Sequence, residues 1–139
     1  MTAYIIEADG GSRGNPGEAA GGAVVIDRDS GEILVELGVY IGHATNNVAE
    51  YHGMIAALEF LETHDAQAPV HVRMDSKLVV EQMSGRWKIK HPDMQVLASR
   101  AREIIGMRRV TFEWIPREQN SRADAAANKS MDLRSSFRA

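Results

Sequence analysis

The sequence predicts an α/β protein in which helices flank a mixed β-sheet. Three strand patterns come first, a long amphipathic helix follows them, and strand and helix patterns then alternate to the end of the chain. The first three strands are joined by short turns, so we expect them to be antiparallel. The later strands are expected to be parallel, because right-handed crossovers through a helix favour that arrangement.

The composition limits the classes of function that are open to the chain. Its 139 residues fit one domain, which we expect at residues 1–133, with a disordered tail at residues 134–139. The absence of cysteine excludes disulfides and thiolate metal sites, so any metal must be bound by oxygen or imidazole. No stretch approaches the ~18 apolar residues of a membrane span and no signal peptide begins the chain, so we expect a soluble, cytoplasmic protein. A net charge of -3 argues against broad electrostatic binding to nucleic acid, unless a basic patch or metal-neutralised acids override it.

The first strand pattern carries one acid to the edge of a predicted glycine-rich turn. Residues 4–8 are mostly apolar, as in a strand buried on both faces, and Asp9 follows them directly. Glycines at 10, 11, 14 and 17 permit positive φ and close approach to a ligand, and residues 15–17 are typical of a tight turn. A buried acid needs a cationic partner, although this segment alone also fits a polar strand end that enters an ordinary hairpin loop.

Alternation and spacing predict the next elements. Residues 22–27 and 32–41 form a hairpin around the polar turn 28–31, and the second of these strands partly alternates, as expected near a sheet edge. The spacing of apolar residues then predicts a helix, and those residues are Val48, Tyr51, Met54, Ile55, Leu58 and Leu61. Glu50 is expected in its first turn, where an acid either stabilises the helix start or serves a site.

The second half of the chain alternates between strands and helices. A strand is expected at 69–75 and a short helix at 76–83, and Asp75-Ser76 between them also fits a simple helix cap. Another helix begins near Pro92, and a strand covers 108–115. The final helix begins near Asn120 or Ser121 and carries Asp124 in its first turn.

Four acids therefore lie at element boundaries, and they could converge. Asp9 and Asp75 come from strand ends, whereas Glu50 and Asp124 come from first turns of helices. If they converge, their mutual repulsion requires divalent cations, and an all-oxygen cluster suits Mg²⁺ or Mn²⁺. Two such ions roughly 3.5–4 Å apart can activate a water and stabilise the departing oxygen in phosphodiester cleavage.

A set of motifs runs along the chain from Tyr4 to about Met131: Asp9-Gly10-Gly11-Ser12 with Gly14-Asn15-Pro16-Gly17, Thr45-Asn46-Asn47-Val48-Ala49-Glu50-Tyr51, Met74-Asp75-Ser76 and Asn120-Ser121-Arg122-Ala123-Asp124. In their order and spacing these motifs resemble those of the type 1 ribonucleases H. The resemblance implies a ribonuclease H-like fold with a five-stranded mixed sheet. It also implies metal-dependent hydrolysis of the RNA strand of an RNA/DNA hybrid, which leaves 5′-phosphate and 3′-hydroxyl ends. The expected cofactor is Mg²⁺, or Mn²⁺ in its place, with two ions bound alongside the substrate. We expect a monomer with no obligate protein partner and no membrane contact.

The resemblance also implies roles for individual residues. Asp9, Glu50, Asp75 and Asp124 match the metal-binding catalytic carboxylates. The peptide groups of residues 10–12 (Gly10, Gly11 and Ser12) would approach the RNA 2′-hydroxyls, which distinguish RNA from DNA. The remaining substrate contacts implied are Asn15, Asn46, Asn47 and, at a DNA phosphate, Thr45. Simple helix capping is the other interpretation of residues 45–47.

Two departures from the family pattern limit this transfer. Many bacterial members insert a basic protrusion between two helices, whereas residues 83–92 here have room only for Arg86, Trp87, Lys88 and Lys90. Trp87 fits either packing or nucleic-acid contact, and the lysines could follow phosphates. Many members also carry a histidine before the last acid, and residues 109–124 contain none. Arg117 or Glu118 is the expected replacement, and we favour Arg117 as a contact to the scissile phosphate.

Two other functions stay open from the sequence. A transposase-like nuclease on the same fold is the nearest enzymatic alternative, but such chains usually add DNA-binding domains, and none is visible here. A nucleic-acid-binding module without catalysis is the alternative from another class. The four acids weigh against it, because a pure binder gains nothing from negative charge that faces phosphates.

Overall fold

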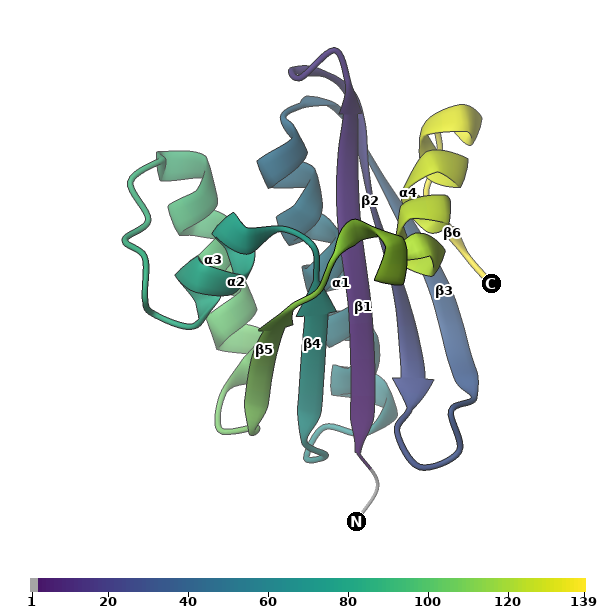
Figure 1. Ribbon diagram of the computed structural model, residues 1–139, viewed down its shortest axis with the longest axis vertical. Helices are drawn as coiled ribbons and strands as arrows, with labels where there is room; N and C mark the ends of the chain where they lie inside the picture. The colour runs from purple at the N-terminus through teal and green to yellow at the C-terminus, as the bar shows by residue number, and fades with distance from the viewer. Residues whose placement is uncertain (1–2) are drawn as a thin grey trace.

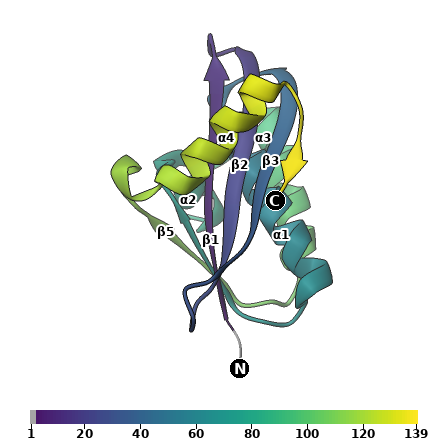
Figure 2. The same ribbon diagram turned by 90° about the vertical axis from the view of Figure 1, so that its right-hand side faces the viewer.

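The computed structural model describes residues 3–139 and contains a mixed six-stranded sheet in the order β5-β4-β1-β2-β3-β6 (Figure 1). Its strands are β1 (Tyr4–Arg13), β2 (Gly17–Asp27), β3 (Ile33–Ala44), β4 (Val70–Met74), β5 (Val110–Trp114) and β6 (Phe137–Arg138). Its helices are α1 (Asn46–His64), α2 (Lys77–Met83), α3 (Pro92–Ile105), the 3₁₀ turn η1 (Arg117–Gln119) and α4 (Ser121–Leu133). Helix α1 lies on one face of the sheet and α4 on the other (Figure 2).

The strand directions agree with those expected from the sequence. β1 pairs antiparallel with β2, and β2 pairs antiparallel with β3. β4 is parallel to both β1 and β5. The predicted fold class is therefore confirmed. No helix within residues 3–139 has the length and hydropathy that a membrane span requires.

The prediction of five strands and a disordered tail is wrong. Phe137 and Arg138 pair with Gly38 and Leu37 of β3, which adds β6 to the sheet. The Ala139 N–H donates to the Glu36 carbonyl at 2.9 Å, and the Glu36 N–H donates to the Ala139 carbonyl at the same distance. A two-residue strand carries no readable periodicity, and its order comes from pairing with a strand that lies about a hundred residues earlier in the chain. The fold therefore continues beyond residue 133.

The glycine-rich segment after Asp9 is mainly strand rather than turn, which corrects a second prediction. β1 continues through Arg13, and Gly10 and Gly11 pair with Gly21 and Ala20. A Cβ atom on Gly10 would lie 2.2 Å from the backbone nitrogen of Glu50. The absence of a side chain at this position allows the backbones of β1 and α1 to approach closely. Positive φ is needed only in the turn, where Gly14 has φ 120°.

Large apolar side chains form one core between the sheet and α1. Tyr51, Met54 and Leu61 of α1 are fully buried against Ile6 of β1 and Val72 of β4. The α4 face is built from smaller residues, because a Cβ on Gly22 would lie 2.4 Å from the backbone of Ala123. Helix α1 therefore packs on β1, the strand that carries Asp9, and α4 packs closely on the neighbouring strand β2.

Candidate active site

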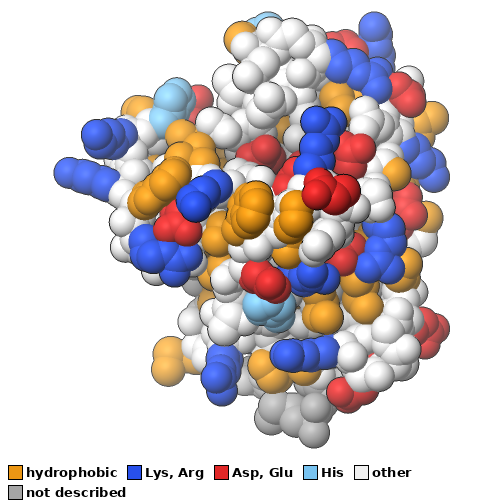
Figure 3. All heavy atoms as spheres, in the orientation of Figure 1, with side chains coloured by type: hydrophobic (Ala, Val, Ile, Leu, Met, Phe, Trp, Pro, Cys, Tyr) orange, Lys and Arg blue, Asp and Glu red, His pale blue; other side chains and the backbone are white. Residues whose placement is uncertain are grey.

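All four acids singled out in the sequence line one pocket of about 320 Å³. Asp9, Glu50, Asp75 and Asp124 come from β1, α1, the end of β4 and α4. The pocket is also lined by Gly10, Gly11, Ser12, Arg13, Asn46, Arg117, Ala127, Asn128 and Met131. On the face of the molecule drawn in Figure 3, acidic and basic side chains lie close together. Four segments that are distant in the sequence thus contribute carboxylates to one place.

Strand register brings the two aspartates of the sheet together. Ala8 of β1 is paired with Met74 of β4 in a parallel ladder, so the next residues, Asp9 and Asp75, lie at neighbouring positions. Asp9 lies within the long strand β1 rather than at its end, and the N–H of Gly10 donates to its Oδ1 at 2.8 Å. Asp75 follows the last residue of β4 and is free to face the pocket, because Ser76 caps α2 by accepting from Val79 N.

The two helical acids reach the pocket in different ways. Asp124 lies in the first turn of α4, as predicted. Glu50 does not lie in the first turn of α1, which contains no acidic residue. The helix begins at Asn46 with Thr45 as its N-cap, so Glu50 is its fifth residue and lies just past the first turn. Close contact with Gly10, rather than the charge at the helix start, accounts for the position of Glu50.

Asn120 is a site residue to which the sequence alone assigned no role. Its side chain is completely buried, and Nδ2 donates to Asp75 Oδ1 at 2.9 Å and to the Ala8 carbonyl at 2.9 Å. The indole N–H of Trp114 donates to the Asp75 carbonyl at 3.1 Å. The motif that contains Asn120 was the only signal in the sequence, and it did not show which side chain the amide contacts.

Burial and mutual repulsion dominate the electrostatics of the pocket. Burial, followed by the charge of Asp75, raises the pKa of Asp9 to about 8, although the Gly10 N–H acts in the opposite direction. Burial also raises the pKa of Glu50 to about 7, against a hydrogen bond from Ser76 and together with the charge of Asp75. Without a cation, the protein therefore favours the protonated form of Asp9 at neutral pH, and Glu50 retains its proton to a higher pH than a free glutamate does.

The carboxylate oxygens in the pocket fit a divalent cation that also binds the substrate. Oε2 of Glu50 is buried and has no hydrogen-bond partner, so a strong acceptor is left for a cation. Within residues 3–139, however, no three His, Cys, Asp or Glu side chains lie close enough together to hold a metal ion by themselves. Magnesium is usually bound by one or two carboxylates together with water and substrate phosphates, and this pocket matches that requirement.

Only some of the residues expected to contact substrate line the pocket. Gly10, Gly11, Ser12 and Asn46 line the pocket, whereas Asn15, Thr45 and Asn47 do not. The Asn15 Oδ1 accepts from the Asn46 N–H at 3.1 Å, which ties the β1–β2 turn to the start of α1. Thr45 caps α1 through Val48 N and lines a neighbouring groove.

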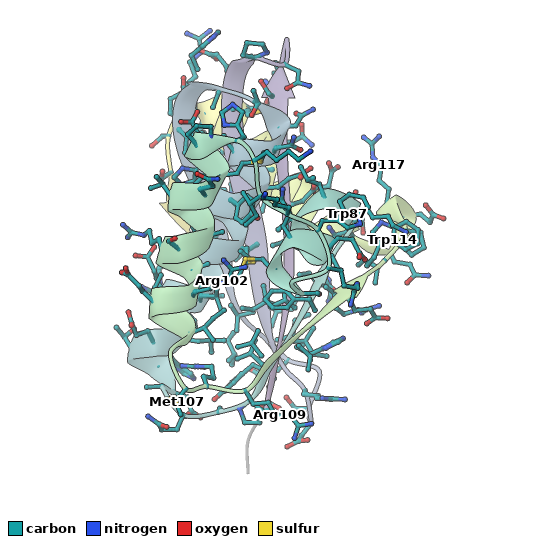
Figure 4. The ribbon with its side chains drawn as sticks, turned by 90° about the vertical axis from the view of Figure 1, so that its left-hand side faces the viewer. Trp87, Arg102, Met107, Arg109, Trp114 and Arg117 are labelled. Atoms are coloured by element: carbon teal, nitrogen blue, oxygen red, sulfur yellow. The ribbon has the colours of Figure 1, made fainter. Side chains whose placement is uncertain are left out.

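The two positions that depart from the family pattern have distinct environments. Arg117 lies exposed on η1 and lines the acidic pocket, whereas Glu118 does not line it. Figure 4 shows Arg117 on the same side of the molecule as Trp87 and Trp114, which are 45% and 48% exposed. Trp87 is therefore not a core residue. Arg86 is held by Glu81 through bonds of 2.6 and 2.9 Å, and residues 84–91 form only a short connection from α2 to α3.

The fold and the pocket define an α/β protein with an acidic, oxygen-only site, and comparison with known proteins gives its family. A family model described as "Reverse transcriptase-like" matches residues 7–130. The bifunctional protein Rv2228c of Mycobacterium tuberculosis is 54% identical over 129 residues, which are 92% of this chain and 35% of that protein. Ribonuclease HI of Halobacterium salinarum is 45% identical over 125 residues, which are 89% of this chain and 62% of that protein. The crystal structure of LC11-RNase H1 in complex with RNA/DNA hybrid superposes with a TM-score of 0.88 at 42% identity, and covers 94% of this chain and 98% of that one.

The chain therefore belongs to the type 1 ribonuclease H family. It spans about a third of the length of the first curated relatives that it matches, 35% in the case of Rv2228c.

Proposed function

We propose that this protein is a metal-dependent endonuclease that hydrolyses the RNA strand of RNA/DNA hybrids and leaves 5′-phosphate and 3′-hydroxyl ends. One observation carries the proposal, namely the meeting of Asp9, Glu50, Asp75 and Asp124 in a single open pocket. The relative LC11-RNase H1, whose structure contains an RNA/DNA hybrid, supports the same choice of substrate. A single copy of the chain supplies every residue of the pocket, so we expect a monomer to be active.

The four carboxylates would hold two divalent ions, Mg²⁺ or Mn²⁺, together with the substrate. When bound, such ions supply an activated water and neutralise the charge on the departing oxygen. Asp9 and Asp75 lie at neighbouring strand positions and would act as one ligand pair, with Asn120 holding Oδ1 of Asp75 in orientation. Asp9 and Glu50 must release their protons before they bind a cation, because their pKa values in the metal-free protein are about 8 and 7.

Selection of RNA would come from the floor of the pocket. Residues 10–12 of β1 line it, and Gly10 and Gly11 have no side chains that would keep a sugar away from the peptide groups. Peptide groups that no side chain covers can contact a 2′-hydroxyl, which DNA lacks. Asn46, at the start of α1, would add a side-chain contact to the duplex.

Arg117 would contact the scissile phosphate, since it lines the same pocket as the four acids. It is exposed, lines the pocket and stands on a short turn that leads to the helix of Asp124. A guanidinium can donate two parallel hydrogen bonds to phosphate oxygens and stays charged at every relevant pH. Arg117 lies in the loop before Asp124, the loop in which many members of the resembled family carry a histidine.

The test compares the parent protein with Asp75→Asn on an end-labelled RNA/DNA hybrid, with and without Mg²⁺. The parent should cut only the RNA strand, and only with the metal present. The asparagine variant should lose at least ~100-fold in rate, because it keeps the shape of Asp75 and removes a ligand charge. Circular dichroism should show an unchanged fold in the variant.

Three results would count against the proposal. Hybrid binding without cleavage by the parent would favour a nucleic-acid-binding module. Cleavage of duplex DNA in preference to the hybrid would favour a transposase-like nuclease. Full activity of Asp75→Asn would remove that residue from the site.

A further inference from the structure

A buried glutamate near the pocket has no place in the mechanism proposed above. Glu7 of β1 is 2% exposed, and an unpaired carboxylate at that depth would be costly. Its Oε1 accepts from Arg122 Nε at 3.1 Å, and its Oε2 accepts from Arg122 Nη2 at 3.0 Å. Arg73 Nη1 lies 3.7 Å from Oε2. Glu7 is therefore held by two guanidinium groups, one of them bidentate.

Each charged residue of this cluster lies two positions before an acid of the pocket. Glu7 precedes Asp9 on β1, and Arg73 precedes Asp75 at the end of β4. Residues two apart on a strand face the same side of the sheet, so the strand members lie directly next to the acids. Arg122 and Asp124 are also two apart, but on a helix such side chains point in different directions, so Arg122 fixes the first turn of α4 rather than the Asp124 carboxylate directly. The cluster thus joins three of the four segments that supply site acids.

Apart from the Asn120 amide, which donates to Asp75 and Ala8, α4 meets the sheet near this point through small residues. Ala123 and Ala127 meet the sheet at Gly22, where a Cβ would lie 2.4 Å from the helix backbone. Contacts of this kind set how close the helix lies, but small residues form shallow ridges that resist sliding and rotation weakly. A bidentate guanidinium–carboxylate pair adds a fixed direction as well as attraction. Glu7 and Arg122 supply a directional contact of this kind in the turn that carries Asp124, in addition to the hydrogen bonds of Asn120.

We propose that Glu7 is a positioning residue, which through Arg122 sets the place of Asp124 relative to Asp9 and so completes the cation site. This inference rests on the proposed function for its catalytic consequence, whereas its effect on cation binding is independent of any cleavage. A role in stability alone is a weaker explanation, because buried ion pairs contribute little net stability compared with well-packed apolar residues.

Two single variants separate positioning from simple electrostatics. Glu7→Gln makes the region more positive, and Arg122→Gln makes it more negative. If charge alone mattered, the first change would weaken Mn²⁺ binding and the second would strengthen it. Positioning predicts that both variants bind Mn²⁺ more weakly and that both lower kcat by ~10- to 100-fold, as expected for partners that orient ligands. KM for the hybrid should stay within about threefold, because the cluster does not line the pocket.

The measurements are Mn²⁺ titration by calorimetry and hybrid cleavage over a range of Mg²⁺ concentrations, on the full chain. Glu59→Gln is the matched control, because it breaks an exposed ion pair with Arg100 at 2.8 Å between α1 and α3. The control should bind Mn²⁺ and cleave as the parent does. Arg122→Lys keeps the charge without the two-point contact, and it should recover only part of the lost kcat.

The outcomes separate this inference from the proposed function. A parent that does not cleave hybrid overturns the proposed function, while the Mn²⁺ affinities still decide the role of Glu7. Opposite shifts in Mn²⁺ affinity for Glu7→Gln and Arg122→Gln, or parental affinity and kcat in both, would overturn the positioning role. If Glu7→Gln does not fold, Arg122→Gln carries the test, since Arg122 is 48% exposed and its loss leaves Arg73 beside Glu7.

Discussion

Replacing Asp9 by asparagine should stabilise the metal-free protein at neutral pH. In the folded protein the pKa of Asp9 is raised to about 8, whereas its ordinary value is 3.8. Between these values the folded state holds a proton that the unfolded state releases, so stability falls as pH rises. The asparagine variant lacks this dependence and keeps the acceptor Oδ1 for the Gly10 N–H.

The size of the effect follows from the pKa difference. Between pH 5 and pH 7 the unfolded chain is ionised at Asp9 and the folded chain is largely protonated, so each pH unit costs the parent about 1.4 kcal/mol. Two units give an upper limit of about 3 kcal/mol. Water that enters the open pocket screens the charges, so we expect the variant to gain about 1 to 3 kcal/mol over this range.

The assay is urea unfolding followed by circular dichroism in metal-free buffer at pH 5 and at pH 7. The difference in free energy of unfolding between variant and parent should grow with pH, at unchanged denaturant dependence. Added Mg²⁺ should stabilise the parent and not the variant, since binding to the folded state shifts its stability. Parallel pH profiles for the two proteins would refute the reasoning, because they would mean that Asp9 is ionised in the folded protein at little cost.

Three further changes test other parts of the site. Arg117→Ala should lower kcat by ~10- to 1000-fold and leave Mn²⁺ affinity unchanged. Glu118→Ala alters no residue of the pocket, so its single-turnover rate should stay close to that of the parent. Equal rates for both variants would mean that no side chain replaces the family histidine. Gly10→Ala should destabilise the fold by at least about 2 kcal/mol and reduce activity, because its Cβ would lie 2.2 Å from the backbone of α1, and parental urea stability would contradict this. Lys88→Ala should raise KM more than it lowers kcat and should reduce the salt dependence of hybrid binding. Arg86→Ala should have smaller effects on both, because Glu81 already binds that guanidinium. Identical salt dependence for the parent and both variants would mean that residues 86–88 are only a solvated surface.

Local patterns in the sequence were enough to predict most elements of the fold. The three- and four-residue spacing from Val48 to Leu61 predicted α1, and the apolar run before Asp9 predicted the start of β1. The order of these elements predicted which strands would be parallel. The four acids stood out because acids at the boundaries of buried elements are costly without a partner. The matching motifs also pointed to the family.

Contacts between distant segments were decided only by the tertiary structure. Glu7 and Arg122 are 115 positions apart, and Asn120 and Asp75 are 45 apart, so no local pattern could reveal that they meet. β6 exists only because β3 offers it an edge. Glu50 enters the pocket because Gly10 admits the backbone of α1, although the sequence placed this acid at the helix start. Periodicity reports which face of one element is buried, whereas the exact meeting of side chains depends on how separate elements pack, and that is a property of the whole chain.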